Sequence, residues 1–197
     1  NVIFRHINYI TGVENTGVQG FADTLITLID HHDDRLKRDT CLILSNIVCG
    51  DRESIEFVLG IHINQKLFKC TKNQDIKVSC SFLSKLIMLI AREAIWTLSS
   101  IAGAGDIDQV SRLVDLGFIE GCCRWLDSDD EQIVSITLTG IKNCLTKVDT
   151  AKIRERILRF QVHEKLELLQ QHENEEISLK ADEIISSLNF TKLQDRN

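Results

Sequence analysis

The sequence predicts an all-α solenoid in which helical units stack side by side. Segments of similar layout recur along its 197 residues, and aligning them on one polar residue gives the anchors Asn8, Asn46, Ser100 and Asn143. Their separations of 38, 54 and 43 residues are typical of helical repeats with a period of about 40 residues. The sequence contains no Pro, so the commonest helix breaker is absent. Such a solenoid usually offers an extended binding surface rather than a catalytic pocket.

Each unit is predicted to contain a short, a medium and a long helix, most clearly in residues 105–148. A short helix begins after the capping residue Asp106, because apolar residues follow it at helical spacing. A second helix covers 118–126, and a polar turn at 127–130 leads into a third helix over 133–145. Three helices per unit are typical of the armadillo repeat rather than of the two-helix tetratricopeptide repeat. We therefore predict a right-handed superhelical armadillo-repeat solenoid.

About four repeats and a partial one are expected along the chain. The partial repeat covers 1–12, with a helix over 2–11, and residues 191–197 form a tail. The full repeats are predicted at about 13–50, 51–104, 105–148 and 151–190. Further helices are expected over 22–31, 35–49, 63–70 and 75–101, and two more within 151–190. Because the sequence starts without Met and inside a repeat, it resembles a fragment of a longer protein.

The separation of 54 residues is too long for an ordinary repeat, and we attribute the excess to an insertion. The extra residues fall at about 79–90. Removing about a dozen residues there would join 75–78 to 92–94 at the usual length of a repeat. A regularly packed helix of ordinary repeat length over 75–101 would contradict this hypothesis.

Composition and charge favour a protein that binds other proteins. The net charge is −6, which argues against nucleic-acid binding because such proteins usually carry a basic stripe. An acidic surface instead attracts basic partners. No signal peptide is visible, and the longest apolar run, 86–91, is too short to span a membrane.

The cysteines indicate reduced core thiols rather than a metal site or a disulfide framework. There are seven, an odd number, and no two of them are spaced as a Cys-x-x-Cys pair. No nucleophile motif and no glycine-rich phosphate loop is present, so neither an enzyme nor a cofactor is expected.

Two neighbouring repeats place the same kinds of residue on one helix face. Glu93, Trp96 and Ser100 have the spacing i, i+3, i+7, which places them on one side of a helix. Equivalent residues of stacked helices line a common concave groove. There an Asn amide can clamp a peptide unit, a Trp face can hold the stem and head of a Lys, and a carboxylate can take the charge. The matching residues one repeat earlier are Asp39, Leu42 and Asn46.

These residues resemble the importin-α family of nuclear import adaptors. The likeness lies in Glu-Ala-x-Trp-x-x-Ser-x-Ile at 93–101, in 131–145, and in the stretch 168–181, which is similar to the family's C-terminal repeat. It covers nearly the whole chain and implies the C-terminal half of such a protein, in the cytoplasm and the nucleus.

The resemblance implies a minor site for nuclear localisation signal peptides and two protein partners. The site residues would be Asn8, Asp39, Asn46, Glu93, Trp96, Ser100 and Asn143. An importin-β-type carrier would bind through a missing N-terminal segment, and a nuclear export receptor would bind through 160–190. The site departs from the family pattern, because Leu42 stands in a Trp position, Ser100 in an Asn position, and Thr139 cannot stack. We therefore expect weak affinity for basic peptides.

Several of these residues also have purely structural interpretations. Trp96 could be a core residue, and Trp125 is expected to be one. Asp127, Asp129 and Asp130 are expected to form a turn and a helix cap rather than a metal loop. At the level of the whole chain, the alternative to an import adaptor is a degenerate armadillo scaffold that carries no cargo. The adaptor interpretation requires Trp96 and Asn46 to face the same groove.

Overall fold

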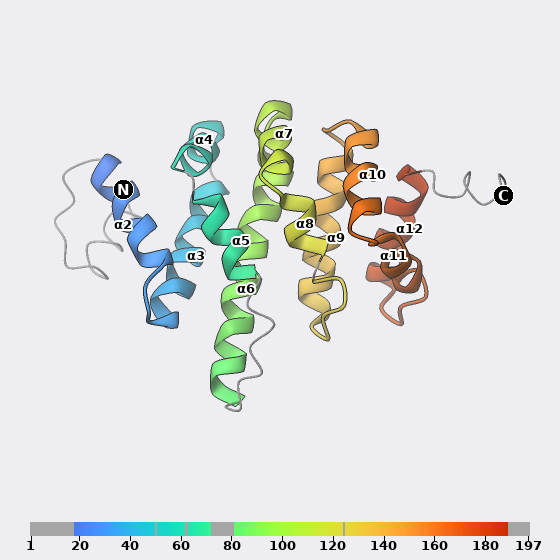
Figure 1. Cartoon of the computed structure of the whole chain (residues 1–197), viewed down its shortest axis with the longest axis horizontal. Coiled ribbons are helices and arrows are strands. Elements are labelled where there is room, and N and C mark those ends of the chain that lie inside the picture. Colours follow the sequence, from blue (N-terminus) through green and yellow to red (C-terminus); the bar gives the residue numbers. More distant parts are fainter. Residues whose placement is uncertain (1–17, 50, 62, 72–80, 124, 189–197) are drawn as a thin grey trace.

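The described part of the chain consists of stacked helices joined by short turns. The computed structural model describes residues 18–49, 51–61, 63–71, 81–123 and 125–188. Within these ranges it contains helices and no strand, which confirms the predicted all-α class (Figure 1). The helices are α2 (Val18–Ile29), α3 (Asp34–Val48), α4 (Arg52–Gly60), α5 (Asn64–Thr71), α6 (Ser81–Ala104), α7 (Ile107–Asp115), α8 (Phe118–Cys123), α9 (Glu131–Leu145), α10 (Thr150–Arg159), α11 (His163–Leu169) and α12 (Glu175–Leu188).

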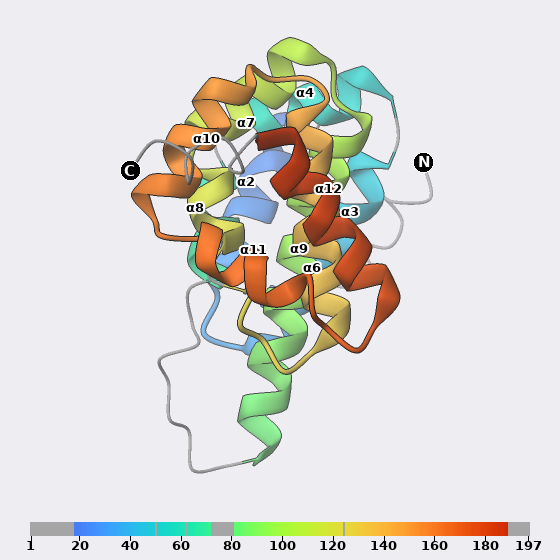
Figure 2. The ribbon, with the colours of Figure 1, turned by 90° about the vertical axis from the view of Figure 1, so that its right-hand side faces the viewer.

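The helices form three parallel rows. The long helices α3, α6, α9 and α12 follow one another along the molecule, and the most extensive helix–helix contacts join α3 to α6, α6 to α9, and α9 to α12. The first helices of the repeats, α4, α7 and α10, lie along the upper edge in Figure 1. Seen from the C-terminal end in Figure 2, α8 and α11 lie on the side away from α3 and α12. One continuous apolar core runs from α2 to α12 between the rows.

Aspartate residues determine where several helices begin. The Asp33 carboxylate accepts a hydrogen bond from the Arg35 backbone N–H at 2.8 Å, and α3 follows. Asp106 and Gln109 cap α7 reciprocally, each side chain bonding the other's backbone N–H. Asp130 caps α9 in the same manner as Asp33 caps α3, as the sequence predicts for the polar turn at 127–130.

Polar contacts fix the register between successive repeats. Thr97 Oγ1 on α6 lies 2.8 Å from the Glu93 carbonyl oxygen of its own helix and 3.2 Å from the Cys41 carbonyl oxygen of α3. Ser99 donates to the Ile136 carbonyl oxygen of α9 at 3.2 Å. Lys147 donates to the carbonyl oxygens of Ala102 and Gly105 at 3.0 and 2.8 Å, at the C-terminal end of α6. A cation there complements the helix dipole. These bonds hold α6 in a fixed position between its two neighbours.

The last repeat contains three helices, one more than the sequence predicts. Residues 150–188 fold into α10, α11 and α12, so the prediction of two helices is wrong. The unrecognised helix is α10, in which only Ile153 and Ile157 are buried and most of the other residues are polar or charged. Two apolar residues at i and i+4 give a weak helical signal, although α10 packs against α8 and α12.

Helix α6 is longer than its equivalents. It has 24 residues, whereas α3 and α9 have 15 each, and its N-terminal end projects beyond both neighbours in Figure 1. Within the described residues α6 begins at 81, whereas 72–80, which include the predicted start at 75, lie outside the described residues. The extra turns coincide with most of 79–90, and the insertion stays a prediction. The helix expected over 2–11 and the anchor Asn8 also lie outside the described residues.

The described cysteines differ in their expected reactivity. Cys49 is exposed, whereas Cys144 is buried, and burial raises the pKa of the Cys144 thiol to about 12. Since the thiolate is the reacting form, the Cys144 thiol should be ionised to only about 1 part in 10⁴ at pH 8. We therefore predict that iodoacetamide modifies Cys49 well before Cys144 in the folded protein at pH 8. Peptide mass spectrometry over time measures both rates, and equal rates in the absence of urea would contradict the prediction.

Candidate functional site

Two adjoining hollows lie along the face formed by the long helices. The first has a volume of about 580 Å³ and the second about 390 Å³. The first hollow is lined by Leu42, Ser45, Asn46, Arg92, Glu93, Trp96, Glu131, Gln132, Ser135, Ile136, Asn174 and Glu176. The second hollow is lined by Trp96, Ser99, Ser100, Gly103, Ser135, Ile136, Thr139, Asn143, Glu176 and Lys180. Four residues line both hollows: Trp96, Ser135, Ile136 and Glu176. The two hollows therefore form one continuous depression across the repeats, which we call the groove.

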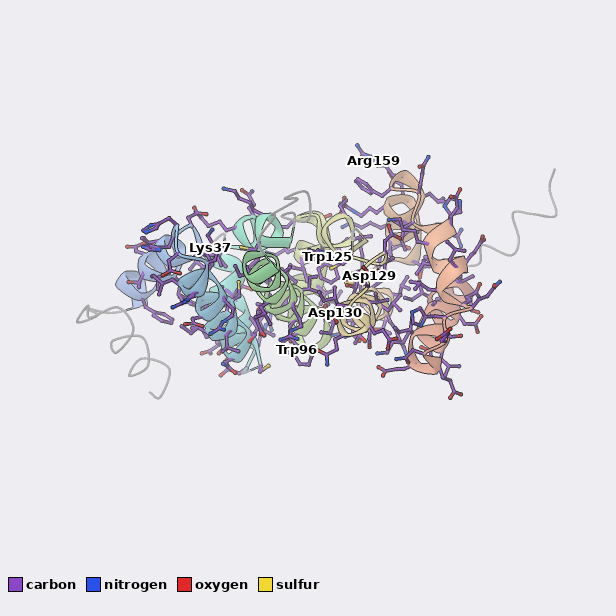
Figure 3. The ribbon with its side chains drawn as sticks, turned by 90° about the horizontal axis from the view of Figure 1, so that it is seen from below. Lys37, Trp96, Trp125, Asp129, Asp130 and Arg159 are labelled. Atoms are coloured by element: carbon purple, nitrogen blue, oxygen red, sulfur yellow. The ribbon has the colours of Figure 1, made fainter. Side chains whose placement is uncertain are left out.

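Trp96 lines both hollows of the groove. Its side chain is 49% exposed although its neighbours on α6, Ile95 and Thr97, are buried. Trp125 is fully buried, so the two tryptophans have opposite roles, and Figure 3 shows Trp96 at the edge of the helices and Trp125 among them. The core interpretation of Trp96 is therefore wrong, whereas that of Trp125 is confirmed.

Amide and hydroxyl groups accompany Trp96 on both sides. Asn46 is exposed in the first hollow, where its Nδ2 donates to the Leu42 carbonyl oxygen at 2.9 Å. Among the described residues its Oδ1 has no partner, so one acceptor and one N–H remain available to a ligand. Ser100 and Asn143 line the second hollow. Gly103 keeps the space beside Asn143 open, since a Cβ there would lie 3.1 Å from Asn143 Nδ2.

Three carboxylates from three different helices line the first hollow. Glu93 comes from α6, Glu131 from α9 and Glu176 from α12. Glu131 accepts a hydrogen bond from Asn174 Nδ2 at 2.7 Å. Glu176 accepts from Lys180 and from Ser135, and these hydrogen bonds lower its pKa, so it is ionised at neutral pH.

The cations that line the groove are already engaged. The Arg92 guanidinium donates to Gln132 Oε1 at 3.2 Å, and Lys180 pairs with Glu176. The first hollow alone contains three carboxylates and one guanidinium, so its lining is net negative. An aromatic face beside such carboxylates can hold the stem and the head of a basic side chain.

The structure brings together most of the site residues predicted from the sequence. Asn46, Glu93 and Trp96 line the first hollow, and Trp96, Ser100 and Asn143 line the second. Asp39 lines neither hollow, and its carboxylate pairs with the Arg38 guanidinium at 2.6 Å on the same helix. Asn8 lies outside the described residues.

Apart from Asn143, the lining residues of α9 and α12 were not predicted from the sequence. Ser135 and Ile136 stand 43 residues after Arg92 and Glu93, the same separation that relates Ser100 to Asn143, so the repeat itself could have identified them. Glu131 and Glu176 have no such signal, since they lie in the first turns of α9 and α12 and the separation of 43 residues relates neither of them to a predicted site residue.

Stacked three-helix units around an open groove define the class of armadillo-repeat proteins. A designed armadillo repeat protein in complex with the peptide (KR)4 matches 87% of the chain with a TM-score of 0.69 and 20% identity, over 68% of its own length. A second designed armadillo repeat protein matches 89% of the chain with a TM-score of 0.69 and 19% identity, over 69% of its length. At this level of identity the likeness shows the fold.

Sequence comparison supplies the particular relatives, although no protein-family model matches the chain. Importin subunit alpha-4 of Arabidopsis thaliana is 30% identical over 80% of the chain, and importin subunit alpha-3 of Caenorhabditis elegans is 36% identical over 43%. Importin subunit alpha-8 of Mus musculus is 30% identical over 58%. The chain spans 29%, 17% and 25% of their lengths, respectively. The resemblance to the importin-α family is thus confirmed, over less than a third of its members' length.

Proposed function

We propose that this chain is part of a nuclear import adaptor and that its groove binds extended basic peptides of the nuclear localisation signal type. The observation that carries the proposal is the position of Trp96, half exposed between two hollows, with the carboxylates of Glu93, Glu131 and Glu176 beside it. An indole face and nearby carboxylates together bind an ammonium or guanidinium group more strongly than either does alone. The amides of Asn46 and Asn143 would hold the peptide backbone.

The proposed partners beyond the peptide follow from the family. An importin-β-type carrier would bind outside this chain, and a nuclear export receptor would bind through 160–190, which include α11 and α12. The protein would then move between the cytoplasm and the nucleus. The relatives that support this are importin subunits alpha, and an armadillo repeat protein of the same fold is known in complex with the basic peptide (KR)4.

Replacing Trp96 by alanine is expected to weaken the binding of a basic peptide. A cation–π contact contributes about 1 to 2 kcal/mol when partly desolvated, so Kd should rise roughly 5- to 30-fold. Fluorescence anisotropy with a labelled, lysine-rich bipartite signal peptide measures the change. Binding should also weaken as salt increases, because the contacts with the carboxylates are ionic.

A matched control separates the groove from surface aromatics in general. Phe160 is 43% exposed, lies outside both hollows, and is therefore a suitable site for the control substitution Phe160→Ala. We expect that substitution to leave Kd unchanged. Equal Kd values for the wild type, Trp96→Ala and Phe160→Ala would contradict a peptide site at Trp96.

Two residues favour the second candidate function, a scaffold that carries no cargo. Leu42 and Ser100 occupy the positions where the importin-α pattern has Trp and Asn, so the groove contains one indole where two would be expected. The same binding experiment separates the candidates, since a scaffold without cargo would show no salt-sensitive, Trp96-dependent affinity for the signal peptide.

A further inference from the structure

We infer that the first hollow selects a mixed peptide segment, in which a Lys or Arg on Trp96 is accompanied by an aliphatic residue against Leu42. This inference rests on the proposed function, because it specifies the peptide that the same groove would bind. It would make the preferred ligand a basic segment interrupted by Leu, Ile, Val or Met rather than an unbroken basic run.

Leu42 is the first reason. It is 45% exposed, lines the first hollow together with Trp96, and stands 54 residues before Trp96, the separation that also relates Asn46 to Ser100. Leu42 and Trp96 therefore occupy equivalent positions on the adjacent helices α3 and α6. A Leu side chain has no aromatic face for a cation, but it offers apolar area that an aliphatic side chain can bury.

The distribution of charge in the hollow is the second reason. The lining carboxylates come from α6, α9 and α12, whereas α3 contributes only Leu42, Ser45 and Asn46. The acid on α3 that corresponds to Glu93 is Asp39, which does not line the hollow and is paired with Arg38 through bonds of 2.6 and 3.0 Å. A Lys placed against Leu42 would thus lose water without gaining an aromatic face or a free carboxylate. An aliphatic side chain in the same place would bury apolar area without that loss.

The geometry of an extended peptide sets the spacing of the two residues. Packed helices lie roughly 8–10 Å apart, and an extended chain advances about 3.3 Å per residue with alternate side chains on one face. The even spacing that comes nearest to this distance is two residues, about 6.6 Å, so side chains that contact neighbouring helices from one face should be two residues apart. The preferred segment is Leu-x-Lys or Lys-x-Leu, and the order that binds better gives the direction of the chain in the groove.

Labelled peptides that differ at one position test the inference. On a constant basic background, we compare the binding of Lys-x-Lys, Leu-x-Lys, Lys-x-Leu, Ala-x-Lys and Lys-x-Ala to the 197-residue chain by anisotropy at physiological salt. The better Leu peptide should bind about fivefold more tightly than its Ala counterpart, since it buries further apolar area. It should also bind more tightly than Lys-x-Lys, although it carries one charge fewer.

Exchanging Leu42 for an indole should reverse the preference. In Leu42→Trp, the affinity for Lys-x-Lys should rise about fivefold, and the advantage of the Leu peptide over Lys-x-Lys should disappear. Leu42→Gln should remove that advantage without improving Lys-x-Lys. Because Leu42 is largely exposed, both variants should fold, and circular dichroism checks this.

The peptide-binding data distinguish a wrong preference for mixed peptides from the absence of a basic-peptide site. The mixed preference is wrong, while the basic-peptide site stands, if three results occur together. Lys-x-Lys would bind most tightly, its binding would depend on Trp96, and Leu42→Trp would leave the order of the peptides unchanged. If no peptide binds in a manner that depends on Trp96, both the site and its preference are wrong.

Discussion

Replacing Trp125 by alanine should lower the free energy of unfolding by about 3 to 5 kcal/mol, as for other large aromatic residues removed from protein cores. Trp125 is fully buried and packs with Ala91, Ile95 and Ile133, so it joins the loop after α8 to both α6 and α9. The cavity left behind would lie between those two helices. Urea unfolding followed by circular dichroism at 222 nm measures the loss.

A smaller substitution at the same position gives the control. Within the described chain, the Trp125 Nε1–H has no hydrogen-bond partner, so Trp125→Phe removes an unsatisfied donor together with part of the ring. We expect Trp125→Phe to cost less than half as much as Trp125→Ala. Equal losses for the two variants would contradict the expectation that the lost apolar volume determines the cost.

The fold could be predicted from the sequence to the extent that each helix has its own local signal. Asp33, Asp106 and Asp130 mark helix starts because each can accept a bond from a free backbone N–H, whatever the rest of the chain does. Helix α10 has an equivalent cap at Asp149, but its buried face consists of two isoleucines only. Its stability comes from packing against α8 and α12, which no local pattern reveals.

The site could be predicted only where the repeat relates one residue to another. The alignment that pairs Asn46 with Ser100 and Asn143 places all three along one face, and the structure shows each of them lining the groove. The same alignment suggested Asp39, which the structure keeps with Arg38 instead, because an ion pair depends on the neighbouring side chain and not on the repeat. Glu176 was missed because its place beside Ser135 depends on how α12 packs on α9.

The groove also depends on details of packing that the repeat pattern conceals. Thr97 and Ser99 are buried polar residues on either side of Leu98, and their hydroxyl oxygens lie 3.2 Å from backbone carbonyl oxygens of α3 and α9, respectively. In the sequence they look like ordinary helix-surface residues. In the structure they fix the position of α6 and hence the direction in which Trp96 points.

The second large effect is expected from adding a side chain to Gly140, where α9 packs against Ser99 of α6. A Cβ at this position would lie 2.6 Å from Ser99 Oγ and 2.7 Å from Phe118 Cζ, and Phe118 is fully buried. We predict that Gly140→Val lowers the free energy of unfolding by about 3 kcal/mol, because overpacking forces the buried ring and the helix apart. Chemical denaturation measures this loss as well.

Two control variants test whether the loss of stability in Gly140→Val comes from overpacking rather than from replacing a glycine as such. Gly60, at the end of α4, has no atom within 4 Å of an added Cβ, so Gly60→Ala should be neutral or stabilise by up to about 1 kcal/mol. Phe118→Leu shortens the opposing side chain, so the double variant with Gly140→Val should lose less stability than the two single losses together. Strict additivity would show that Phe118 does not limit the space.

Since Ser99 orients α6, Gly140→Val should also weaken any peptide binding that depends on Trp96, at temperatures where the variant is still folded.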